Sequence, residues 1–254
     1  MNVLAVIIAR AGSAGLKNKH LLPLLGKPVI HYTFEHARAA RSINRAVVST
    51  DCADVRKLAE RNFFETIARP SDLATAEASV QDVLLHSLRT VEERSQFRAD
   101  AIALLYGNVP VRGDGVIDRA IEHLQETGCD SVRSFCPVGK WHPAWMARIE
   151  GDARDRVIPV QQASIHRRQD LAPLYLHDGA IVAMSRESLL RGEKFPSDPH
   201  AFFGVERRAI ITAIGETVEI DHQRDLFWAE AVLREREGGT VARTALPTLA
   251  KVAS

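Results

Sequence analysis

Short, continuous apolar runs recur along the chain, and in its first half each is followed by turn residues and a segment with helical periodicity. A strand that is apolar on both faces must be buried on both, which is typical of parallel sheets covered by helices on each side. The sequence therefore predicts an α/β fold with a mostly parallel sheet. The predicted strands lie at 3–9, 46–50, 101–105, 131–132, 180–184 and 209–213.

Apolar residues at helical spacing lie between and after these runs. Between about residues 137 and 175, Trp, Pro and Arg residues replace the alternating pattern, so we expect an inserted arm there. Residues 1–238 would form a single domain carrying this arm, and the small, polar and basic residues 239–254 would form a loose tail. Helices are predicted at 28–37, 54–61, 79–91, 116–125 and 223–236.

The composition limits the partners. With 33 Lys and Arg residues against 32 Asp and Glu residues, the chain has no net field that would steer a polyanion toward it. Three widely spaced cysteines without a CxxC pair disfavour a disulfide framework or a thiolate zinc site. The first apolar run is far shorter than the ~20 residues that span a bilayer. We therefore expect a cytoplasmic protein that binds neither nucleic acid nor membrane, and that holds any phosphate through local contacts.

The loop after the first apolar run combines small residues with basic ones. Gly12 and Gly15 would let backbone N–H groups approach an anion, and Arg10, Lys17 and Lys19 would supply positive charge. Ligands of α/β sheets prefer this location. Because the loop lacks both GxGxxG and the Walker A pattern, a dinucleotide-binding fold and an ATPase are disfavoured. A tight loop without a ligand is the alternative, and the basic residues favour a phosphate site.

Further motifs follow this loop in order. They are Gly-Lys-Pro at 26–28, Val-Ser-Thr-Asp at 48–51, Arg-Pro-Ser-Asp-Leu-Ala-Thr at 69–75, Arg-Gln-Asp-Leu at 168–171, Asp-Gly-Ala at 178–180 and Val-Glu-Ile-Asp at 218–221. Together with Ala-Arg-x-Gly-Ser-x-Gly-Leu at 9–16, this series resembles the acylneuraminate cytidylyltransferase family, the synthetases of CMP-sialic acid and other CMP-nonulosonic acids. The resemblance covers about residues 2–232.

The resemblance implies a Rossmann-like, three-layer nucleotidyltransferase fold with a small dimerisation insertion. It implies a cytidylyltransferase that couples CTP to the anomeric hydroxyl of an acidic nine-carbon sugar, giving a CMP-sugar and pyrophosphate. The hydroxyl would attack the α-phosphate in line, with Mg²⁺ (or Mn²⁺) as the cofactor. The implied partners are CTP, the sugar acid and a second copy of the chain in a homodimer.

The resemblance also implies which residues bind the nucleotide. Arg10 and Lys19 would be catalytic, because they would stabilise the charge that builds on the leaving pyrophosphate. Arg69 and Ser79 would read the cytosine and the neighbouring ribose. The implied nucleotide-binding residues are Arg10, Ala11, Gly12, Ser13, Gly15, Lys19, Arg69 and Ser79.

Glu219 and Asp221 match the positions where the family holds its metal. Their alternation along a predicted strand would direct both carboxylates to one face, and a hard cation needs oxygen ligands gathered in this way. Asp221 is the stronger metal ligand of the two and the third implied catalytic residue. A merely polar strand end is the alternative interpretation.

A third group of residues is implied on the sugar side. Arg168 would pair with the acceptor's carboxylate, a role that suits a bidentate guanidinium. Lys140, in the arm, would enter the partner subunit's site. For Phe202 and Phe203, ordinary interface packing is an equal alternative. The implied sugar-binding residues are Tyr106, Lys140, Arg168, Asp178, Phe202 and Phe203.

Five positions depart from the family pattern. Ala14 replaces a lysine, His20 and Asp178 each replace an asparagine, Tyr106 replaces a glutamine, and Glu219 replaces an aspartate. These changes leave open an acceptor other than sialic acid. They also leave two alternatives: a nucleotidyltransferase of the same fold that uses another nucleoside triphosphate or a sugar 1-phosphate, and a nucleotide-binding relative that has lost catalysis.

Overall fold

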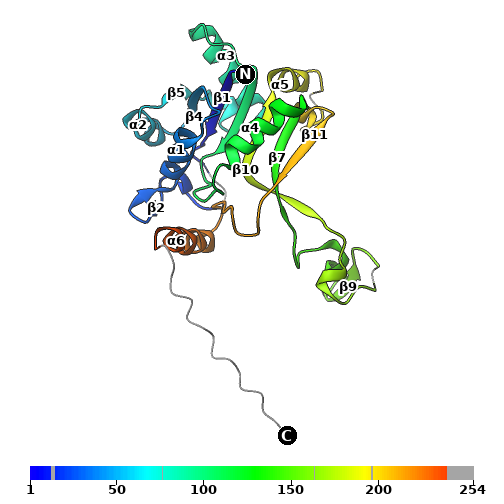
Figure 1. The fold of residues 1–254 in the computed structure, drawn as a ribbon. Coiled ribbons are helices and arrows are strands. Elements are labelled where there is room, and N and C mark those ends of the chain that lie inside the picture. Colours follow the sequence, from blue (N-terminus) through cyan, green and yellow to red (C-terminus); the bar gives the residue numbers. More distant parts are fainter. Residues whose placement is uncertain (13–14, 76, 163, 196, 239–254) are drawn as a thin grey trace.

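The computed structural model describes residues 1–12, 15–75, 77–162, 164–195 and 197–238. Within these residues, seven strands form a central sheet in the order β11-β7-β10-β6-β1-β4-β5, shown in Figure 1. The strands are β1 (Val3–Ile8), β4 (Arg45–Thr50), β5 (Glu65–Ala68), β6 (Ala101–Tyr106), β7 (Ser131–Pro137), β10 (Tyr175–Ser185) and β11 (Arg207–Ile211).

The predicted, mostly parallel sheet is confirmed. β1 runs parallel to β4 and β6, β4 is parallel to β5, and β7 is parallel to β11. The exception is β10, which lies antiparallel between β6 and β7. All six predicted strands are present, and the four-residue β5 was not predicted.

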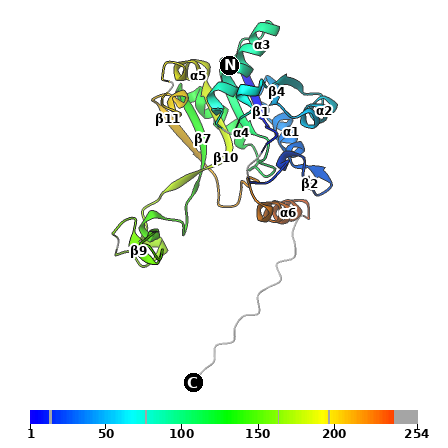
Figure 2. The ribbon, with the colours of Figure 1, turned by 180° about the vertical axis from the view of Figure 1, so that it is seen from behind.

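Helices cover both faces of the sheet, so the predicted three-layer arrangement is confirmed (Figures 1 and 2). Apolar residues of α1, α2 and α4 pack in one core on one face, and those of α3 and α5 pack in a second core on the other. A third, smaller core joins α6 to α1. The helices are α1 (Val29–Ala39), α2 (Ala53–Arg61), α3 (Val80–Arg94), α4 (Val116–Thr127), α5 (Arg186–Gly192) and α6 (Gln223–Glu237).

The predicted arm leaves the sheet where β7 ends and returns where β10 begins, and both views show it projecting away from the body (Figures 1 and 2). Its own strands, β8 (Ala147–Glu150) and β9 (Arg156–Pro159), form an antiparallel hairpin that was not predicted. It exposes large apolar side chains, among them Trp141, Ile149 and Val157. The predicted tail, 239–254, lies outside the described residues.

Short elements complete the described chain. Besides the hairpin of β2 (Pro23–Leu24) and β3 (Lys27–Pro28), there are five single-turn 3-10 helices. None of the described helices combines the length and the apolar character needed to cross a membrane. The 3-10 helices are η1 (Lys19–Leu21), η2 (Ser71–Leu73), η3 (Pro143–Trp145), η4 (Arg168–Asp170) and η5 (Ala201–Phe203).

Candidate active site

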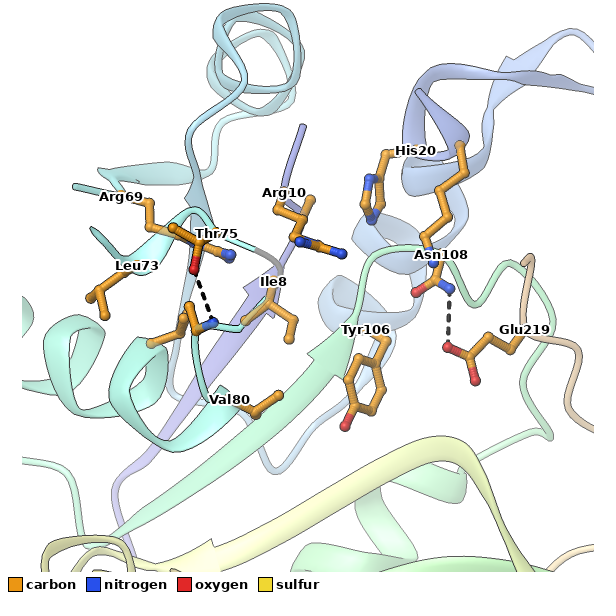
Figure 3. Close-up of a pocket in the computed structure, with 14 residues that line it drawn as sticks. Ile8, Arg10, His20, Arg69, Leu73, Thr75, Val80, Tyr106, Asn108 and Glu219 are labelled. Atoms are coloured by element: carbon orange, nitrogen blue, oxygen red, sulfur yellow. Dashed lines mark hydrogen bonds between the residues drawn. The ribbon is translucent and has the colours of Figure 1, made fainter. Parts of the chain in front are cut away.

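A cavity of ≈ 280 Å³ lies at the carboxyl ends of β1 and β6 (Figure 3). Ligands of open α/β sheets bind in this position. Figure 3 shows arginine side chains on one side of the cavity and the Glu219 carboxylate on the other. Its lining residues are Ile8, Ala9, Arg10, Lys19, His20, Arg69, Leu73, Thr75, Ala78, Val80, Val83, Tyr106, Asn108 and Glu219.

The first loop enters this cavity from the end of β1. The backbone N–H of Ala11 donates to the Asp51 carboxylate at 2.9 Å, which ties the start of the loop to the end of β4. A Cβ on Gly15 would lie 2.8 Å from the backbone oxygen of Asp221, whereas no described atom lies within 4 Å of the corresponding position on Gly12. Gly15 is therefore required by a close backbone approach, and Gly12 borders open space. The predicted contact at Ser13 lies outside the described residues.

Arg69, directly after β5, brings a nearly buried cation to the cavity. Its Nη2 donates to the Ser49 carbonyl at 2.9 Å, while its Nε finds no hydrogen-bond partner among the described residues. Burial lowers the pKa of Arg69, and the Asp51 carboxylate opposes that shift. Because the Arg69 side chain lines the cavity, its guanidinium is suited to an acceptor group on a ligand.

His20 lines the same cavity and is 5% exposed. Burial, followed by the charges of Lys19, Arg69 and Arg10, lowers the pKa of His20 to about 3. The imidazole is therefore neutral at physiological pH, and it adds a hydrogen-bonding group without adding charge.

On the side of the cavity opposite the two arginines, Lys19 lies close to Glu219 and Asp221. Lys19 Nζ forms an ion pair with Asp221 Oδ1 at 2.8 Å. The amide nitrogen of Asn108 donates to Glu219 Oε1 at 3.0 Å and to Asp221 Oδ1 at 3.5 Å. Both carboxylates thus face one amide group.

The predicted reason for this gathering was wrong. Residues 219–221 do not form a strand; Val218 makes only an isolated bridge with Val111. The segment is held instead by the Ile220 N–H, which donates to the Asn108 carbonyl at 2.8 Å, and by the Asn108 side chain. The two carboxylates are therefore brought together by contacts between loops, and not by alternation along a strand.

The carboxylates of Glu219 and Asp221 are the groups that could bind a magnesium ion. Burial raises the pKa of Glu219, the Asp221 charge adds to this effect, and the Asn108 hydrogen bond opposes it. No described group of three or more His, Cys, Asp or Glu side chains could hold a metal. Mg²⁺ is commonly bound by one or two carboxylates together with substrate phosphates. The pair therefore fits an ion that arrives with a phosphorylated substrate.

Arg112, which sequence reasoning missed, shapes the loop after β6. Its side chain is 1% exposed and donates to the carbonyl oxygens of Tyr106, Val109 and Ala180 at 2.9, 2.6 and 2.8 Å. Burial lowers the pKa of Arg112 to about 9. These bonds fix the loop that carries Asn108. Asn108 was missed too, although a polar residue just past an apolar strand was a usable signal.

Tyr106 and Asp178 differ in their relation to the cavity. Tyr106 lines it, and burial, with the Glu219 charge, raises the pKa of Tyr106 to about 12 against an opposing effect of Arg133. Asp178 is not a lining residue; its carboxylate accepts hydrogen bonds from the Ser134 and Thr212 hydroxyls. Burial by itself raises the pKa of Asp178, but these hydrogen bonds bring it below its ordinary value. Its charge is thus engaged within the protein.

Besides Asp178, Asp221 and the glycines and Ala11 of the first loop, five further predicted residues do not line the cavity of their own chain. Ser79 caps α3, since its hydroxyl accepts from the Asp82 N–H at 3.0 Å and donates to the Asp82 carboxylate at 2.7 Å. Phe202 and Phe203 are 4% and 7% exposed and pack in the core beneath α3 and α5, so no sugar could touch them without repacking. The other two, Lys140 and Arg168, lie in the arm.

Comparison with known sequences gives the family. A model of the cytidylyltransferase family matches residues 4–226. The N-acylneuraminate cytidylyltransferase of Streptococcus agalactiae serotype V is 33% identical over 199 residues, which cover 77% of this chain and 46% of that protein. The CMP-N,N'-diacetyllegionaminic acid synthase of Legionella pneumophila is 29% identical over 232 residues, covering 90% of this chain and 94% of that protein. The chain thus spans about half the length of the streptococcal relative.

Comparison with solved structures supports the fold. CMP:2-keto-3-deoxy-manno-octonic acid synthetase, solved in complex with CTP, superposes with a TM-score of 0.71 at 19% identity, covering 93% of this chain and 100% of that one. The 4-diphosphocytidyl-2C-methyl-D-erythritol synthase of Anaerococcus prevotii gives a TM-score of 0.62 at 12% identity, over 92% of this chain and 99% of that one. The nucleotidyltransferase fold is thereby confirmed. By the sequence match over residues 4–226, the chain belongs to the cytidylyltransferase family.

Proposed function

We propose that this chain transfers CMP from CTP to the anomeric hydroxyl of an acidic nine-carbon sugar and releases pyrophosphate. The observation that carries the proposal is one cavity lined by Arg10 and Arg69 on one side and by Lys19 and Glu219 on the other, with Asp221 paired to Lys19. The relatives named for CMP-sialic and CMP-legionaminic acid synthesis support the choice of substrates.

The triphosphate would lie along the first loop. Arg10 and Lys19 would contact its oxygens and stabilise the charge that builds on the leaving pyrophosphate. The open space beside Gly12 leaves room for that approach. Arg69 would hold the base and ribose end, because its side chain lines the cavity.

Glu219 and Asp221 would hold Mg²⁺ (or Mn²⁺), which when bound offsets the negative charge of the phosphate oxygens. In the described structure Asp221 is paired with Lys19. Lys19 would exchange this carboxylate for a phosphate oxygen when the nucleotide binds. Asn108 would keep both carboxylates oriented, since its amide nitrogen contacts each of them.

The arm supports a homodimer as part of the same proposal. Trp141 is 69% exposed and Val157 is 62% exposed, and such apolar surface favours burial against a partner. A second copy would cover the arm and accept Lys140 and Arg168 at its acceptor side. Sedimentation at micromolar concentration tests this, and a monomer would contradict it.

A cytoplasmic location belongs to the proposal as well. The cysteines Cys52, Cys129 and Cys136 are all unpaired, which fits a reducing compartment.

The decisive experiment is a pyrophosphate-release screen. Four nucleoside triphosphates are tested against sialic, legionaminic, pseudaminic and 3-deoxy-octulosonic acids. We expect release with CTP and a nine-carbon acid, and its loss in Lys19→Met. The matched control is Lys27→Met, because Lys27 pairs with Glu35 outside the cavity. Release with GTP or UTP and a sugar 1-phosphate, but never with CTP and a sugar acid, would overturn the proposal.

A further inference from the structure

Arg133, on β7, holds its guanidinium between two aromatic rings. The guanidinium carbon lies 4.4 Å from the ring centre of Phe203 and 4.9 Å from that of Phe135. Cation–π contact of this kind fixes the plane of a guanidinium and favours its charge. Phe203, which was predicted to touch the sugar, instead supports an arginine.

The charge of Arg133 has no protein partner in the described part of the chain. No described carboxylate lies within 4.0 Å of its nitrogens, and none of its N–H groups makes a hydrogen bond to a described residue. The neighbouring Arg207 is a like charge, and its own donors are used by the Gly204 and His200 carbonyls. Since rings pack against Arg133, its in-plane N–H groups remain for an acceptor outside the protein.

The register of the sheet places Arg133 beside the cavity. Val182 on β10 pairs with Leu104 on one side and with Arg133 on the other, so the three side chains leave the same face of the sheet. Tyr106, two residues beyond Leu104, is on this face too and lines the cavity. The Arg133 charge is close enough to counter the rise in the pKa of Tyr106 that burial and Glu219 cause.

Tyr106 separates two regions of the site. On its β1 side, Ile8 pairs with it and the phosphate loop follows. On its β10 side lies Arg133. The side that Arg133 flanks is therefore the side left for the second substrate once a nucleotide occupies the loop. The Asp178 carboxylate does not compete, because the Ser134 and Thr212 hydroxyls already bind it.

We propose that Arg133 binds the carboxylate of the acceptor sugar acid and so selects acids over neutral sugars. This inference rests on the proposed function. A planar carboxylate accepts two parallel N–H bonds from a guanidinium, and clamping that guanidinium beforehand reduces the entropy lost on binding. The assignment places an acid-binding cation within the same chain as the nucleotide site, in addition to Arg168 on the arm.

The test measures both binding and turnover of N-acetylneuraminic acid and of its methyl ester. Wild type, Arg133→Gln, Arg133→Lys and the control Arg208→Gln are compared, Arg208 being an exposed residue of β11 paired with Glu206. We expect Arg133→Gln to weaken binding of the acid, and to raise its KM, by about 10- to 100-fold, as for other hydrogen bonds to charged groups. The KM for CTP should stay unchanged, and Arg133→Lys should recover part of the loss.

The methyl ester separates recognition from a structural defect. Wild type and Arg208→Gln should prefer the acid, whereas Arg133→Gln should bind acid and ester alike. If Arg133→Gln keeps the wild-type preference for the acid, the role of Arg133 is overturned while the proposed function stands. The wild-type protein is also tested with legionaminic, pseudaminic and 3-deoxy-octulosonic acids. If it neither binds nor turns over any of the four acids, the role of Arg133 and the proposed function are both overturned.

Discussion

Replacing Gly15 by alanine tests whether the phosphate loop must lie against the carboxylate segment. The added Cβ would stand 2.8 Å from the backbone oxygen of Asp221, where ordinary contact begins near 3.4 Å. One of the two backbones therefore has to move by about 0.6 Å, the difference between these distances.

The Asp221 segment resists that movement. The Asp221 N–H donates to Asp225 at 2.9 Å, its carboxylate pairs with Lys19 at 2.8 Å, and the preceding N–H is bonded to the Asn108 carbonyl at 2.8 Å. Overpacking of this kind costs about 1–3 kcal/mol, which corresponds to a fall in Tm of about 2–12 °C for a domain of this size. Because a 1 Å misplacement of reacting groups costs about 100-fold in rate, we expect kcat to fall by roughly tenfold.

The assay is pyrophosphate release, with thermal unfolding on the same samples. Gly12→Ala is the matched control, because nothing lies within 4 Å of the position its Cβ would take in the described structure. In the absence of ligand, Gly12→Ala should leave Tm unchanged. Equal Tm values and equal kcat values for the two variants would refute the reasoning.

Three further predictions concern stability, pH and metal. Arg112→Met would remove the guanidinium donor from three buried carbonyl oxygens, of which only those of Tyr106 and Val109 keep a contact with the Thr33 hydroxyl, so urea unfolding should show a loss of about 3–5 kcal/mol; an unchanged midpoint would count against the role of the guanidinium. Burial holds the pKa values of His20 and His36 at about 3. Below pH 6.5 the unfolded chain then binds more protons, so the folded state loses up to about 1.4 kcal/mol per histidine per pH unit down to about pH 3. For His36→Gln, the free energy of unfolding measured in urea should fall less between pH 7 and pH 5 than it does for the wild type. An equal fall in both proteins would contradict this. Removing divalent ions with EDTA should abolish pyrophosphate release, and calorimetry should show weaker Mg²⁺ binding to Asp221→Asn with CTP present; full activity in EDTA would exclude the metal.

Elements buried on both faces could be predicted from the sequence, because burial alone gives them a continuous apolar run. β1 and β6 are such strands. The exposed β8 and β9 of the arm carry no such signal, because nothing in the described chain buries both their faces. The short α5 was missed although its cap was readable: Ser185 accepts from the Ser188 N–H.

The residues of the candidate site likewise fall into those that could be predicted from the sequence and those that could not. Arg10, Lys19 and Arg69 could be found because each stands in a local motif next to a strand end. Arg112 and Arg133 could not, because their roles depend on contacts between segments far apart in the sequence. Arg112 binds carbonyls of β6, of the loop after it and of β10, and Arg133 packs against an aromatic ring from η5. A motif predicts which residues meet a substrate, whereas the residues that orient them become visible only in the folded chain.

The antiparallel insertion of β10 has a consequence for the order in which the chain folds. The strands β1, β4, β5 and β6 neighbour one another, so they can pair while the rest of the protein is still being made. The sheet neighbours of β7 are β10 and β11, both made later, so β7 must wait for the whole arm to emerge before it joins the sheet. The nucleotide half of the site can thus assemble during synthesis, while Arg133 takes its place only when β10 closes the gap. A ribosome-bound chain that ends before β10 should therefore protect the amides of β1 and β4 from hydrogen exchange well before those of β7.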